Sequence, residues 1–393
     1  MNNDVVILSA VRTPIGRFRG AYKNMSAPEL GAIAVRAAVE RSGVDPTLFD
    51  QCIMGNVISA GLGQAPARQA ALRGGLPEHV GGLTINKVCG SGLMAVELAR
   101  ALIRIGDDEF IVAGGMESMT GAPYLLKHGR SGYHMGHGEL LDAVFYDGLW
   151  CTFEEKMMAS LGDDIARARQ ISRADQDAFA LESHRRAIAA QDLGYFAEEI
   201  VPVELPVERG TRIIISADET PRRDTSLEAL SRLRPVFAED GTVTAGNAPG
   251  LSDGASALVV ASGARAEALG LKPLARILGF GQAADPPADL FAAPELAIRQ
   301  LLEHTNTRLS DYKLFEINEA FAAQVLANVR TLGIDHANLN IDGGAIALGH
   351  PIGASGARVL TSLIYSLRRR GGGRGIAALC LGGGEAVAMA VEC

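Results

Sequence analysis

The chain has 393 residues, which is long for one ordinary domain and sufficient for two or three. Hydrophobic residues make up 48% of it and charged residues 21%, a composition that excludes a disordered or fibrous protein. The formal net charge of −8 argues against a general surface for nucleic acid or for an anionic membrane, so an anionic ligand would need a local basic patch.

The cysteine usage indicates the compartment. Five cysteines are odd in number and widely spaced, and none lies in a CxxC or Cys/His cluster that would suggest zinc or a redox pair. We therefore expect free thiols, a reducing compartment and no metal site. Residues 1–4 carry no basic stretch, the apolar run after them is too short for a signal peptide, and no segment approaches the ~20 apolar residues needed to cross a bilayer. The expected location is the cytoplasm.

The first third of the chain alternates apolar runs of strand length with longer segments of helical periodicity. The expected elements are strands over 4–11, 52–58, 83–88 and 110–113 and helices over 28–41 and 90–105. This alternation predicts an α/β layered domain with a mostly parallel sheet.

From about residue 116 to 250 the pattern degrades, and only one amphipathic helix, over 173–191, is clear. Insertions of this length in compact domains are usually functional or form interfaces. The α/β rhythm then returns with strands over 257–261, 314–317, 376–381 and 386–391 and helices over 294–303, 320–332 and 355–370. We expect a large insertion between two regular α/β regions.

Two of the expected helices, over 91–104 and 355–370, resemble each other. Each is apolar around most of its circumference and carries one narrow polar line, which is typical of a helix buried between layers. Each begins at a Gly-rich turn with a Ser-Gly pair and leads into a β-run that meets glycines. This weak internal duplication predicts two similar halves with a central pair of helices packed between two sheets.

A cysteine stands at one of these strand-to-helix turns, in the sequence Asn-Lys-Val-Cys-Gly-Ser-Gly at 86–92. Backbone N–H groups and the positive end of the helix stabilise a thiolate there, so we expect a lowered pKa at Cys89. The flanking glycines permit a sharp turn and the approach of a substrate. The alternative is a small buried apolar cysteine, which is the commoner role of a lone cysteine.

Three further motifs carry reactive or polar groups. His350 opens the second buried helix, where it would accept a proton from Cys89 if the two halves face each other. Cys380 ends a strand before a glycine run whose N–H groups would face a developing oxyanion. Asn318 lies where a hydrophobic strand gives way to a helix. The structural alternatives are a core histidine bound to a carbonyl, a core cysteine and, preferred for Asn318 on spacing alone, a helix N-cap.

Together these motifs resemble those of the thiolase family over essentially the whole chain, and within it the acetyl-CoA acetyltransferase group. The matching segments are Ser-Ala-Val-Arg-Thr-Pro-Ile-Gly at 9–16, Gly-Gly-Met-Glu-Ser-Met at 114–119, Gly-Thr-Val-Thr-Ala-Gly-Asn at 241–247, Asn-Glu-Ala-Phe at 318–321 and Gly-Gly-Ala-Ile-Ala-Leu-Gly-His-Pro-Ile-Gly at 343–353. A long multi-part match in the right order is far more specific than any one motif.

The resemblance implies a role for each residue of these motifs. Cys89 would be the nucleophile that carries the acyl group as a thioester, with His350 activating it. Cys380 would exchange a proton with the α-carbon of acetyl-CoA. Asn318 would hold a water that forms, with His350, an oxyanion hole for the enolate. The N–H groups of Cys89 and Gly382 would form a second oxyanion hole, for the thioester carbonyl.

The resemblance also implies a five-layered αβαβα fold in which a loop domain is inserted into the first of two similar halves. The first half is expected over 1–118 and 251–271, the loop domain over 119–250 and the second half over 272–393. Similar enzymes are dimers or tetramers that bind coenzyme A largely through the loop domain. We therefore expect a homodimer or homotetramer.

The ligands that the resemblance implies are acetyl-CoA, other acyl-CoA esters and CoA. They would act as substrates, with no permanently bound cofactor and no nucleic-acid or membrane partner. Contacts to coenzyme A are expected from Arg222, Ala248, Pro249, Met158, Ala320 and Phe321. Arg222 with Arg223 would form the basic patch for the phosphates, and the alternative is a solvated turn beside Asp224.

The chain departs from the acetoacetyl-CoA thiolase pattern in the binding region. Pro249 stands where the family typically has a serine that meets the pantetheine arm. Met157 and Met158 stand where short-chain thiolases have a His-Met pair, and Ala229 replaces a serine near the adenine. These changes leave the reaction class intact and leave open the acyl-chain preference and the affinity for coenzyme A.

Three activities follow from the resemblance. The favoured one is an acyltransferase of fatty acid metabolism that condenses two acetyl-CoA reversibly to acetoacetyl-CoA and CoA. The alternative enzyme is a degradative 3-ketoacyl-CoA thiolase for longer or unusual chains; the related condensing synthases usually lack a second catalytic cysteine such as Cys380. The third is a catalytically idle acyl-CoA-binding protein, against which the intact set of Cys89, His350, Cys380 and Asn318 argues.

Overall fold

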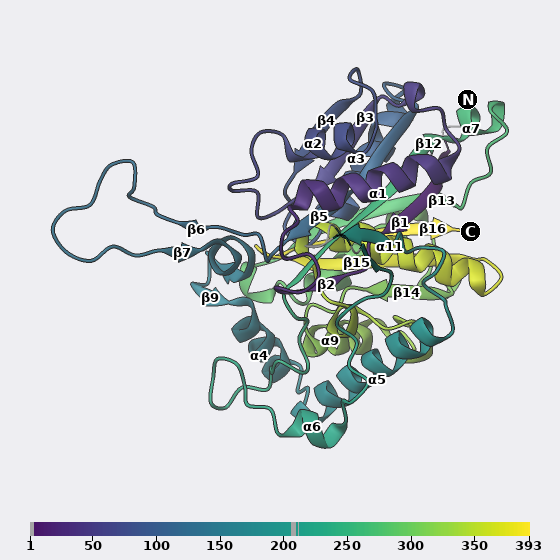
Figure 1. The fold of residues 1–393 in the computed structure, drawn as a ribbon. Coiled ribbons are helices and arrows are strands. Elements are labelled where there is room, and N and C mark those ends of the chain that lie inside the picture. The colour runs from purple at the N-terminus through teal and green to yellow at the C-terminus, as the bar shows by residue number, and fades with distance from the viewer. Residues whose placement is uncertain (1–3, 206–209, 211) are drawn as a thin grey trace.

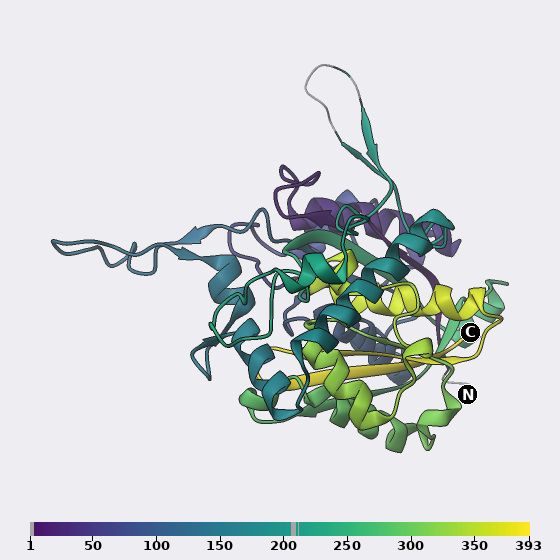
Figure 2. The same ribbon diagram turned by 90° about the horizontal axis from the view of Figure 1, so that it is seen from below.

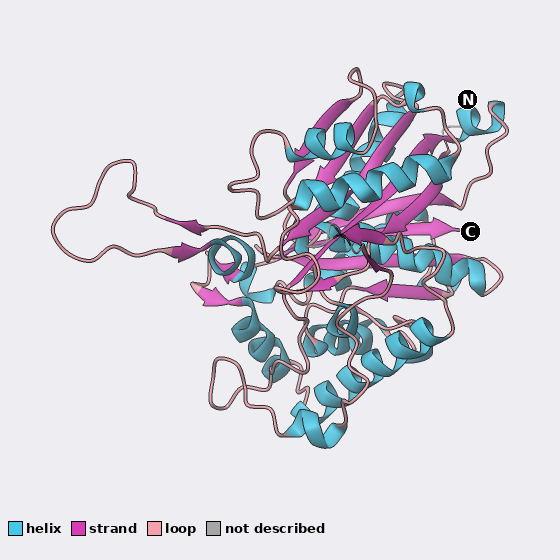
Figure 3. Cartoon of the chain, in the orientation of Figure 1, coloured by secondary structure: helices cyan, strands magenta, loops and turns pink. Residues whose placement is uncertain are grey.

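The structure is a computed structural model that describes residues 4–205, 210 and 212–393, and the expectation drawn from residues 1–3 lies outside this part of the chain. Its main sheet has ten strands, which cross the centre of the molecule (Figure 3). They are β1 (Val5–Arg12), β2 (Gly16–Arg17), β3 (Gln51–Gly55), β4 (Gly81–Ile85), β5 (Phe110–Ser118), β12 (Ser252–Ser262), β13 (Ala275–Ala284), β14 (Leu314–Ile317), β15 (Arg374–Leu381) and β16 (Glu385–Glu392). Their order is β14–β15–β16–β13–β1–β12–β5–β3–β4, with β2 beside β12.

The two ends of this sheet repeat one arrangement. In the first half, β3 pairs in parallel with β5, which pairs in antiparallel with β12, which pairs in antiparallel with β1. In the second half, β14, β15, β16 and β13 follow in the same order and with the same directions. This repetition confirms the predicted pair of similar halves. The expectation of a mostly parallel sheet is wrong, because each half contains two antiparallel pairs.

One short pairing links the halves. β1 pairs with β13 over only two residues, Val6 with Arg276 and Ile7 with Ala275, so the strands form one continuous path although the two halves lie in separate layers. The helices outside the insertion are α1 (Ala27–Ser42), α2 (Pro66–Arg73), α3 (Ser91–Ile105), α7 (Gly263–Ala268), α8 (Ala293–Thr305), α9 (Ala322–Leu332), α10 (Ala345–Leu348) and α11 (Ile352–Arg369).

The helices complete five layers, in the order αβαβα (Figures 1 and 2). α1 and α2 cover the outer face of the first half, α3 and α11 lie between the halves, and α8 and α9 cover the outer face of the second half. Alternate residues of β12 show the layering, because Leu258 and Val260 face the central helices whereas Val259 and Ala261 face α1.

The central helices α3 and α11 approach each other closely at their first turns. A Cβ atom on Gly92 would lie 2.7 Å from the backbone N of Ala357, and one on Gly356 would collide with Leu93. The two Ser-Gly pairs found in the sequence therefore permit this crossing. α11 is buried along nearly its whole length, as predicted, whereas α3 exposes its last turn, where Ile105 is 70% exposed.

The described residues of the inserted region after β5 form short strands, three α-helices and a short π-helix over Val144–Leu149. Its elements are β6 (Tyr124–Leu125), β7 (Leu141–Asp142), β8 (Trp150–Cys151), β9 (Lys156–Met157), α4 (Met158–Ala168), α5 (Arg173–Asp192), β10 (Val203–Leu205), β11 (Ile213–Ile215) and α6 (Leu227–Ser231). The segment between β6 and β7 projects from the body as a long arm (Figure 1), and β10 and β11 form a second projection (Figure 2).

The predicted helix over 173–191 is α5, but its buried face is made of small and polar residues and is not hydrophobic. Gln176 donates a hydrogen bond to Thr242 Oγ1 at 2.9 Å, and Ser183 donates one to Glu319 Oε2 at 2.7 Å. Polar contacts therefore dock this helix beside the segment that follows β14.

Element boundaries differ from the predictions where a turn interrupts an apolar run. The strands expected over 52–58 and 83–88 end at Gly55 and Ile85, and the helices expected over 320–332 and 355–370 begin at Ala322 and Ile352. The sequence did not predict helices α2, α4, α6, α7 and α10, strand β13 or the strands of two or three residues. Within the described residues, we find no helix with the length and apolarity that a bilayer crossing demands.

Candidate active site

The four predicted reactive side chains come from both halves, and each lies at an end of a central helix or strand. Cys89 and His350 each stand two residues before a central helix, α3 and α11 respectively. Asn318 directly follows β14, where its N–H donates to Ala378 O at 2.9 Å, and Cys380 is the penultimate residue of β15. The halves therefore face each other here, as predicted.

Apolar and electrostatic contacts join these segments. The turn at Gly90 packs so closely on Leu381 that a Cβ atom there would collide with it. The two thiols also interact electrostatically, because a negative charge on Cys89 raises the pKa of Cys380. On the other side, Cys89 packs in one apolar cluster with Ile352, two residues from His350.

A strained turn presents the thiol of Cys89. Val88 has φ +46°, a left-handed conformation that a β-branched residue rarely adopts. Ser91 holds this turn, because its Oγ accepts from Lys87 N at 2.8 Å and donates to Val88 O at 2.7 Å. Asn86 Oδ1 accepts from the N–H of Val88 at 3.0 Å. The sequence Asn-Lys-Val-Cys-Gly-Ser-Gly thus forms a sharp elbow between β4 and α3.

The expected lowering of the Cys89 pKa is wrong. Burial of the thiol raises its pKa to about 12, and the nearby Glu117 carboxylate acts in the same direction. The N–H groups of Cys89 and Gly382 face the sulfur and act in the opposite direction, but they do not outweigh desolvation. The resting group is therefore a neutral thiol that needs a base to become a nucleophile.

His350 is arranged as that base. Ser355 Oγ donates to Pro351 O at 2.8 Å, so its contact with His350 Nδ1 at 2.6 Å is one in which the imidazole donates. Nδ1 therefore carries the proton, and the buried Nε2 has no partner among the described residues. Burial and the charge of Arg358 lower the pKa of His350 to about 3, so the ring is neutral at pH 7. The alternative of a core histidine bound to a carbonyl is wrong.

Asn318 does not cap the following helix. α9 begins at Ala322 with Phe321 at the N-cap position, so the structural alternative preferred on spacing is wrong. Asn318 is buried, its Oδ1 accepts a hydrogen bond from Arg358 at 3.3 Å, and its Nδ2 has no partner within the described chain. A buried amide donor of this kind is suited to stabilising a negative oxygen.

Cys380 lies in a tightly apolar environment. It is 1% exposed and packs in a cluster with Cys151, Leu161 and Ala320. Burial raises its pKa well above the usual range. A thiolate formed here is a strong base, which suits it to remove a weakly acidic proton.

Glu117 is a structural carboxylate of this site to which the sequence argument gave no role. It accepts hydrogen bonds from Asn56 Nδ2 at 2.8 Å and from the N–H groups of Val57, Ile58 and Gly353 at 3.1, 3.2 and 2.9 Å. It thereby ties the first turn of α11 to the first half of the chain. Burial raises its pKa to about 7 despite these donors. The Gly-Gly-Met-Glu-Ser-Met motif was the signal for it.

Three of the six expected coenzyme A contacts lie near the two cysteines. Met158 lies beside the elbow, where its Cε would be 3.7 Å from a Cβ atom on Gly382. Ala320 and Phe321 share an apolar cluster with Cys380.

Ala248 and Pro249 belong to a half-buried loop that ends near the predicted base. Beyond this loop, Ser252 Oγ donates to Gly250 O at 2.7 Å and accepts from the N–H of His350 at 3.1 Å. The loop is therefore fastened to the segment that carries His350.

Arg222 is exposed on the loop before α6, where its N–H donates to His184 Nδ1 at 3.2 Å. Arg223 forms an ion pair with Asp192, with Nη1 donating to Oδ2 at 2.9 Å. The guanidinium of Arg222 forms no ion pair with the described residues, so of the two predicted cations it is the one left available.

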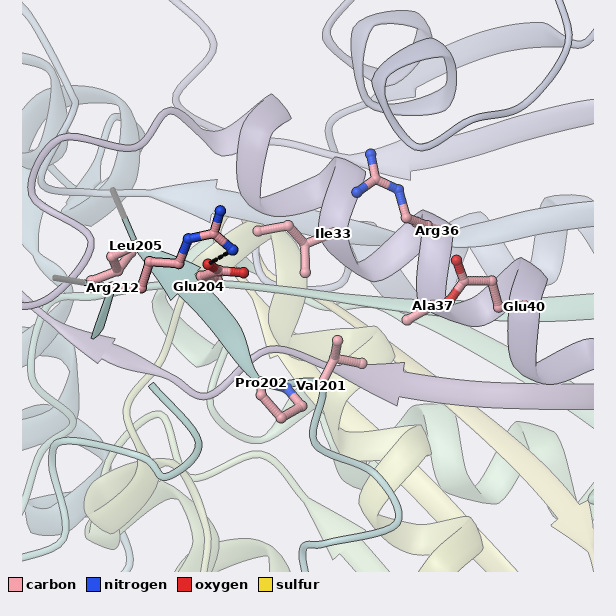
Figure 4. A pocket seen from close by; sticks show the side chains of 9 residues that line it. All are labelled: Ile33, Arg36, Ala37, Glu40, Val201, Pro202, Glu204, Leu205 and Arg212. Atoms are coloured by element: carbon pink, nitrogen blue, oxygen red, sulfur yellow. Dashed lines mark ion pairs between the residues drawn. The ribbon is translucent and has the colours of Figure 1, made fainter. Parts of the chain in front are cut away.

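A surface pocket lies away from these residues, between α1 and the β10–β11 hairpin (Figure 4). The ion pair of Arg212 with Glu204, at 2.7 Å, forms one wall, and Ile33 and Arg36 belong to α1. Its lining in the described part of the chain includes no predicted site residue. No group of three or more described His, Cys, Asp or Glu side chains is arranged to hold a metal ion.

The sequence and fold were compared with known proteins. The family models described as "Thiolase, N-terminal domain" and "Thiolase, C-terminal domain" match residues 5–264 and 271–393. Acetyl-CoA acetyltransferases of Escherichia coli and Pseudomonas aeruginosa are 49% and 48% identical, each over 98% of both chains. The crystal structure of the Bacillus anthracis acetyl-CoA acetyltransferase matches with a TM-score of 0.97 at 44% identity, over 99% of this chain and 98% of that one. Because both halves and nearly the whole chain match, the chain belongs to the thiolase family.

Proposed function

We propose that this thiolase is an acetyl-CoA C-acetyltransferase, which condenses two acetyl-CoA reversibly to acetoacetyl-CoA and CoA. The observation that carries the proposal is the proton-free Nε2 of a neutral His350, which has no partner among the described residues, at a site that also holds half-buried Cys89 and buried Cys380. The names of the similar enzymes support the substrate. The intact set of reactive groups argues against an idle acyl-CoA-binding protein.

The first half-reaction transfers an acetyl group to Cys89. His350 Nε2 accepts the thiol proton while the sulfur attacks the carbonyl of acetyl-CoA, and the imidazolium then returns this proton to the departing CoA sulfur. The N–H groups of Cys89 and Gly382, which face the sulfur, donate to the negative carbonyl oxygen. The products are acetyl-Cys89, neutral His350 and CoA.

The second half-reaction forms the carbon–carbon bond. His350 accepts the proton of Cys380, and the thiolate removes a proton from the α-carbon of a second acetyl-CoA. The enolate oxygen is stabilised by the imidazolium and by a water that Asn318 holds. The enolate attacks the acetyl-Cys89 carbonyl, and the Cys89 thiolate that leaves takes the proton from His350.

Replacing Ser355 by alanine is expected to slow acetylation of Cys89 about 10- to 100-fold. The change leaves the Nδ1–H of His350 without its acceptor, a loss of about 1–3 kcal/mol, and frees the ring to protonate Nε2 instead. Rapid-quench mass spectrometry with acetyl-CoA measures the rate. Ser366→Ala is the matched control, because it removes a hydrogen bond to Asp342 from the same helix. Equal rates in the wild type and the Ser355 variant would remove Ser355 from this role.

The binding region supports a second candidate, a 3-ketoacyl-CoA thiolase that accepts chains longer than four carbons. Met158 borders the elbow with a flexible thioether, a group that adapts to ligands of varied shape. Pro249 offers neither a hydroxyl nor a backbone N–H to a pantetheine amide. Rates of CoA-dependent cleavage across 3-ketoacyl-CoA esters of four to eight carbons test both candidates. No cleavage of any ester would overturn the proposed function.

Restoring a serine at position 249 is expected to lower the KM for acetoacetyl-CoA about 2- to 12-fold with little change in kcat. The net free energy of one ordinary hydrogen bond corresponds to this change in KM. Because a contact to the pantetheine arm is made equally in the ground and transition states, kcat is unaffected. Steady-state kinetics of Pro249→Ser, with Pro249→Ala as the control for lost rigidity, measure it. An unchanged KM together with a strict four-carbon preference would contradict this view of the pocket.

We also propose the domain limits 1–118 with 251–271, 119–250 and 272–393, with coenzyme A held mainly by the middle segment. A homodimer or homotetramer is supported by two surfaces. β4 is an open sheet edge with Leu83 43% exposed, and at the arm Tyr124 of β6 and Leu140 are 65% and 62% exposed. The cytoplasm remains the predicted location, consistent with five free cysteines.

A further inference from the structure

Arg358 is a buried cation of α11 that the proposed mechanism does not use. Its side chain is 2% exposed and lies two turns after the start of the helix. Nη2 donates to Asn318 Oδ1 at 3.3 Å, and Nη1 lies 3.8 Å from Glu316 Oε2 at the end of β14. The sequence showed it only as part of the polar line of a buried helix.

The contact decides which end of the Asn318 carboxamide enters the site. The oxygen and the NH₂ of a carboxamide are nearly identical in shape, so packing alone does not distinguish the two orientations. A guanidinium carries donors and no acceptor, so it pairs with the oxygen and repels the NH₂. The Nδ2 of Asn318, which has no partner within the described chain, is thereby left to donate elsewhere.

The surroundings keep this cation in place. Glu316 is 3% exposed, and its Oε2 lies beside the guanidinium, although burial raises the pKa of this carboxyl well above its usual range. Glu319, the next residue after Asn318, accepts hydrogen bonds from Ser183 Oγ and Asn340 Nδ2, at 2.7 and 2.9 Å. The field of Arg358 also reaches His350, whose pKa it lowers. One cation therefore acts on both groups that the proposed function assigns to the enolate oxygen.

We infer that Arg358 is a positioning residue for the enolate half-reaction: it orients the Asn318 carboxamide so that Nδ2 serves as a donor in the site. The inference rests on the proposed function. It requires no contact from Arg358 in the transfer of acetyl to Cys89, where Asn318 has no role; loss of the cation raises the pKa of His350 and leaves it the base of that step. Loss of Arg358 therefore separates the two half-reactions, which a general structural defect does not.

The experiment compares Arg358→Met, and Arg358→Met with Glu316→Gln, against the wild type. The double variant removes both members of the buried pair, so it keeps the test valid if the single variant fails to fold. Acetylation of Cys89 by acetyl-CoA is expected within about threefold of the wild-type rate. Deuterium exchange at the acetyl-CoA methyl group and condensation are expected to fall about 10- to 150-fold, the usual value of a hydrogen bond to a charged group.

Two controls separate positioning from packing. Arg358→Lys keeps a cationic donor and is expected to recover at least part of the lost exchange. Ser362→Ala, one turn further along α11 and bonded to Glu199, is expected to leave both half-reactions unchanged. In an Asn318→Ala background, Arg358→Met is expected to add less than about threefold to the loss, because the group it orients is gone.

The outcomes are distinct. An equal fall in acetylation and exchange, or a full further loss in the Asn318→Ala background, overturns the inference. The inference is also overturned if the wild type acetylates Cys89 and exchanges the methyl protons and the Arg358 variants do both equally well. That result leaves the proposed function standing. A wild-type protein that does neither overturns the proposed function itself.

Discussion

Replacing Cys89 by alanine is expected to lower CoA-dependent cleavage of acetoacetyl-CoA by about 10⁴- to 10⁶-fold, the scale of losing a nucleophile that acts as one unit with its base. The wild type incubated with acetyl-CoA is expected to gain one acetyl group on the peptide that contains Cys89. The reason is geometric, because among the five cysteines Cys89 stands at a strained elbow where two backbone donors face its sulfur.

Cys52 provides the matched control. It is a buried cysteine of β3, and burial raises its pKa to about 12, the same value as for Cys89. Only Cys89 lies at the strained turn beside Gly382, so pKa alone predicts equal reactivity and the geometry predicts acetylation at Cys89. Cys52→Ala is therefore expected to keep both adduct and activity. An acetyl group that persists in Cys89→Ala would show that the nucleophile is another residue.

The pKa of Cys89 was predicted wrongly from its position at a helix N-terminus. A helix N-terminus stabilises a negative charge by about 0.3–1 kcal/mol, whereas one pKa unit corresponds to about 1.4 kcal/mol. Burial shifts a thiol pKa by more than that, so desolvation wins even with two N–H groups facing the sulfur. The sequence shows where the helix begins. It does not show how closely Leu381 and Met158 pack around the turn, and this packing sets the burial of the thiol.

The site residues were predictable because each stands at an end of an element. Gly-rich motifs marked the starts of α3 and α11 and the end of β15, and the order of motifs placed them in one family. The partners were not predictable. Ser355 fixes the tautomer of His350 from five residues away, and Arg358 was visible only as a polar position of a helix. Such pairs depend on which faces of two halves meet, and a single sequence does not show this.

The fold was predictable in its layers and less so in its strand directions. Alternating strands and helices favour parallel neighbours, but β12 and β16 each enter between two strands that run the other way. Strand β13 was missed because two glycines, Gly279 and Gly281, interrupt its apolar alternation. Both lie against α8, where a Cβ atom on Gly281 would lie 2.7 Å from Leu301 N. The residues that weakened the sequence signal are those that the helix contact requires.

Replacing Cys380 by alanine is expected to leave acetylation of Cys89 largely intact and to lower condensation and α-proton exchange about 10²- to 10⁴-fold, the usual contribution of a positioned acid or base. An α-proton of a thioester is very weakly acidic, so the reaction needs a strong base held against the α-carbon. Burial raises the pKa of Cys380 well above its usual range, which makes its thiolate such a base. Mass spectrometry of the acetyl adduct and deuterium exchange into acetyl-CoA measure the two half-reactions separately.

Cys151 makes this prediction specific. It is 2% exposed and packs in the same apolar cluster as Cys380, so Cys151→Ala removes the same atom from the same cluster without removing the base. That variant is expected to keep both half-reactions, while Cys380→Ser, which preserves the volume but replaces the thiol by a far weaker acid, is expected to lose exchange as Cys380→Ala does. If Cys380→Ala instead loses acetylation and exchange to the same degree, Cys380 belongs to the activation of Cys89. Both thiols would then act in the acetylation step, and the α-proton would be removed by a different residue.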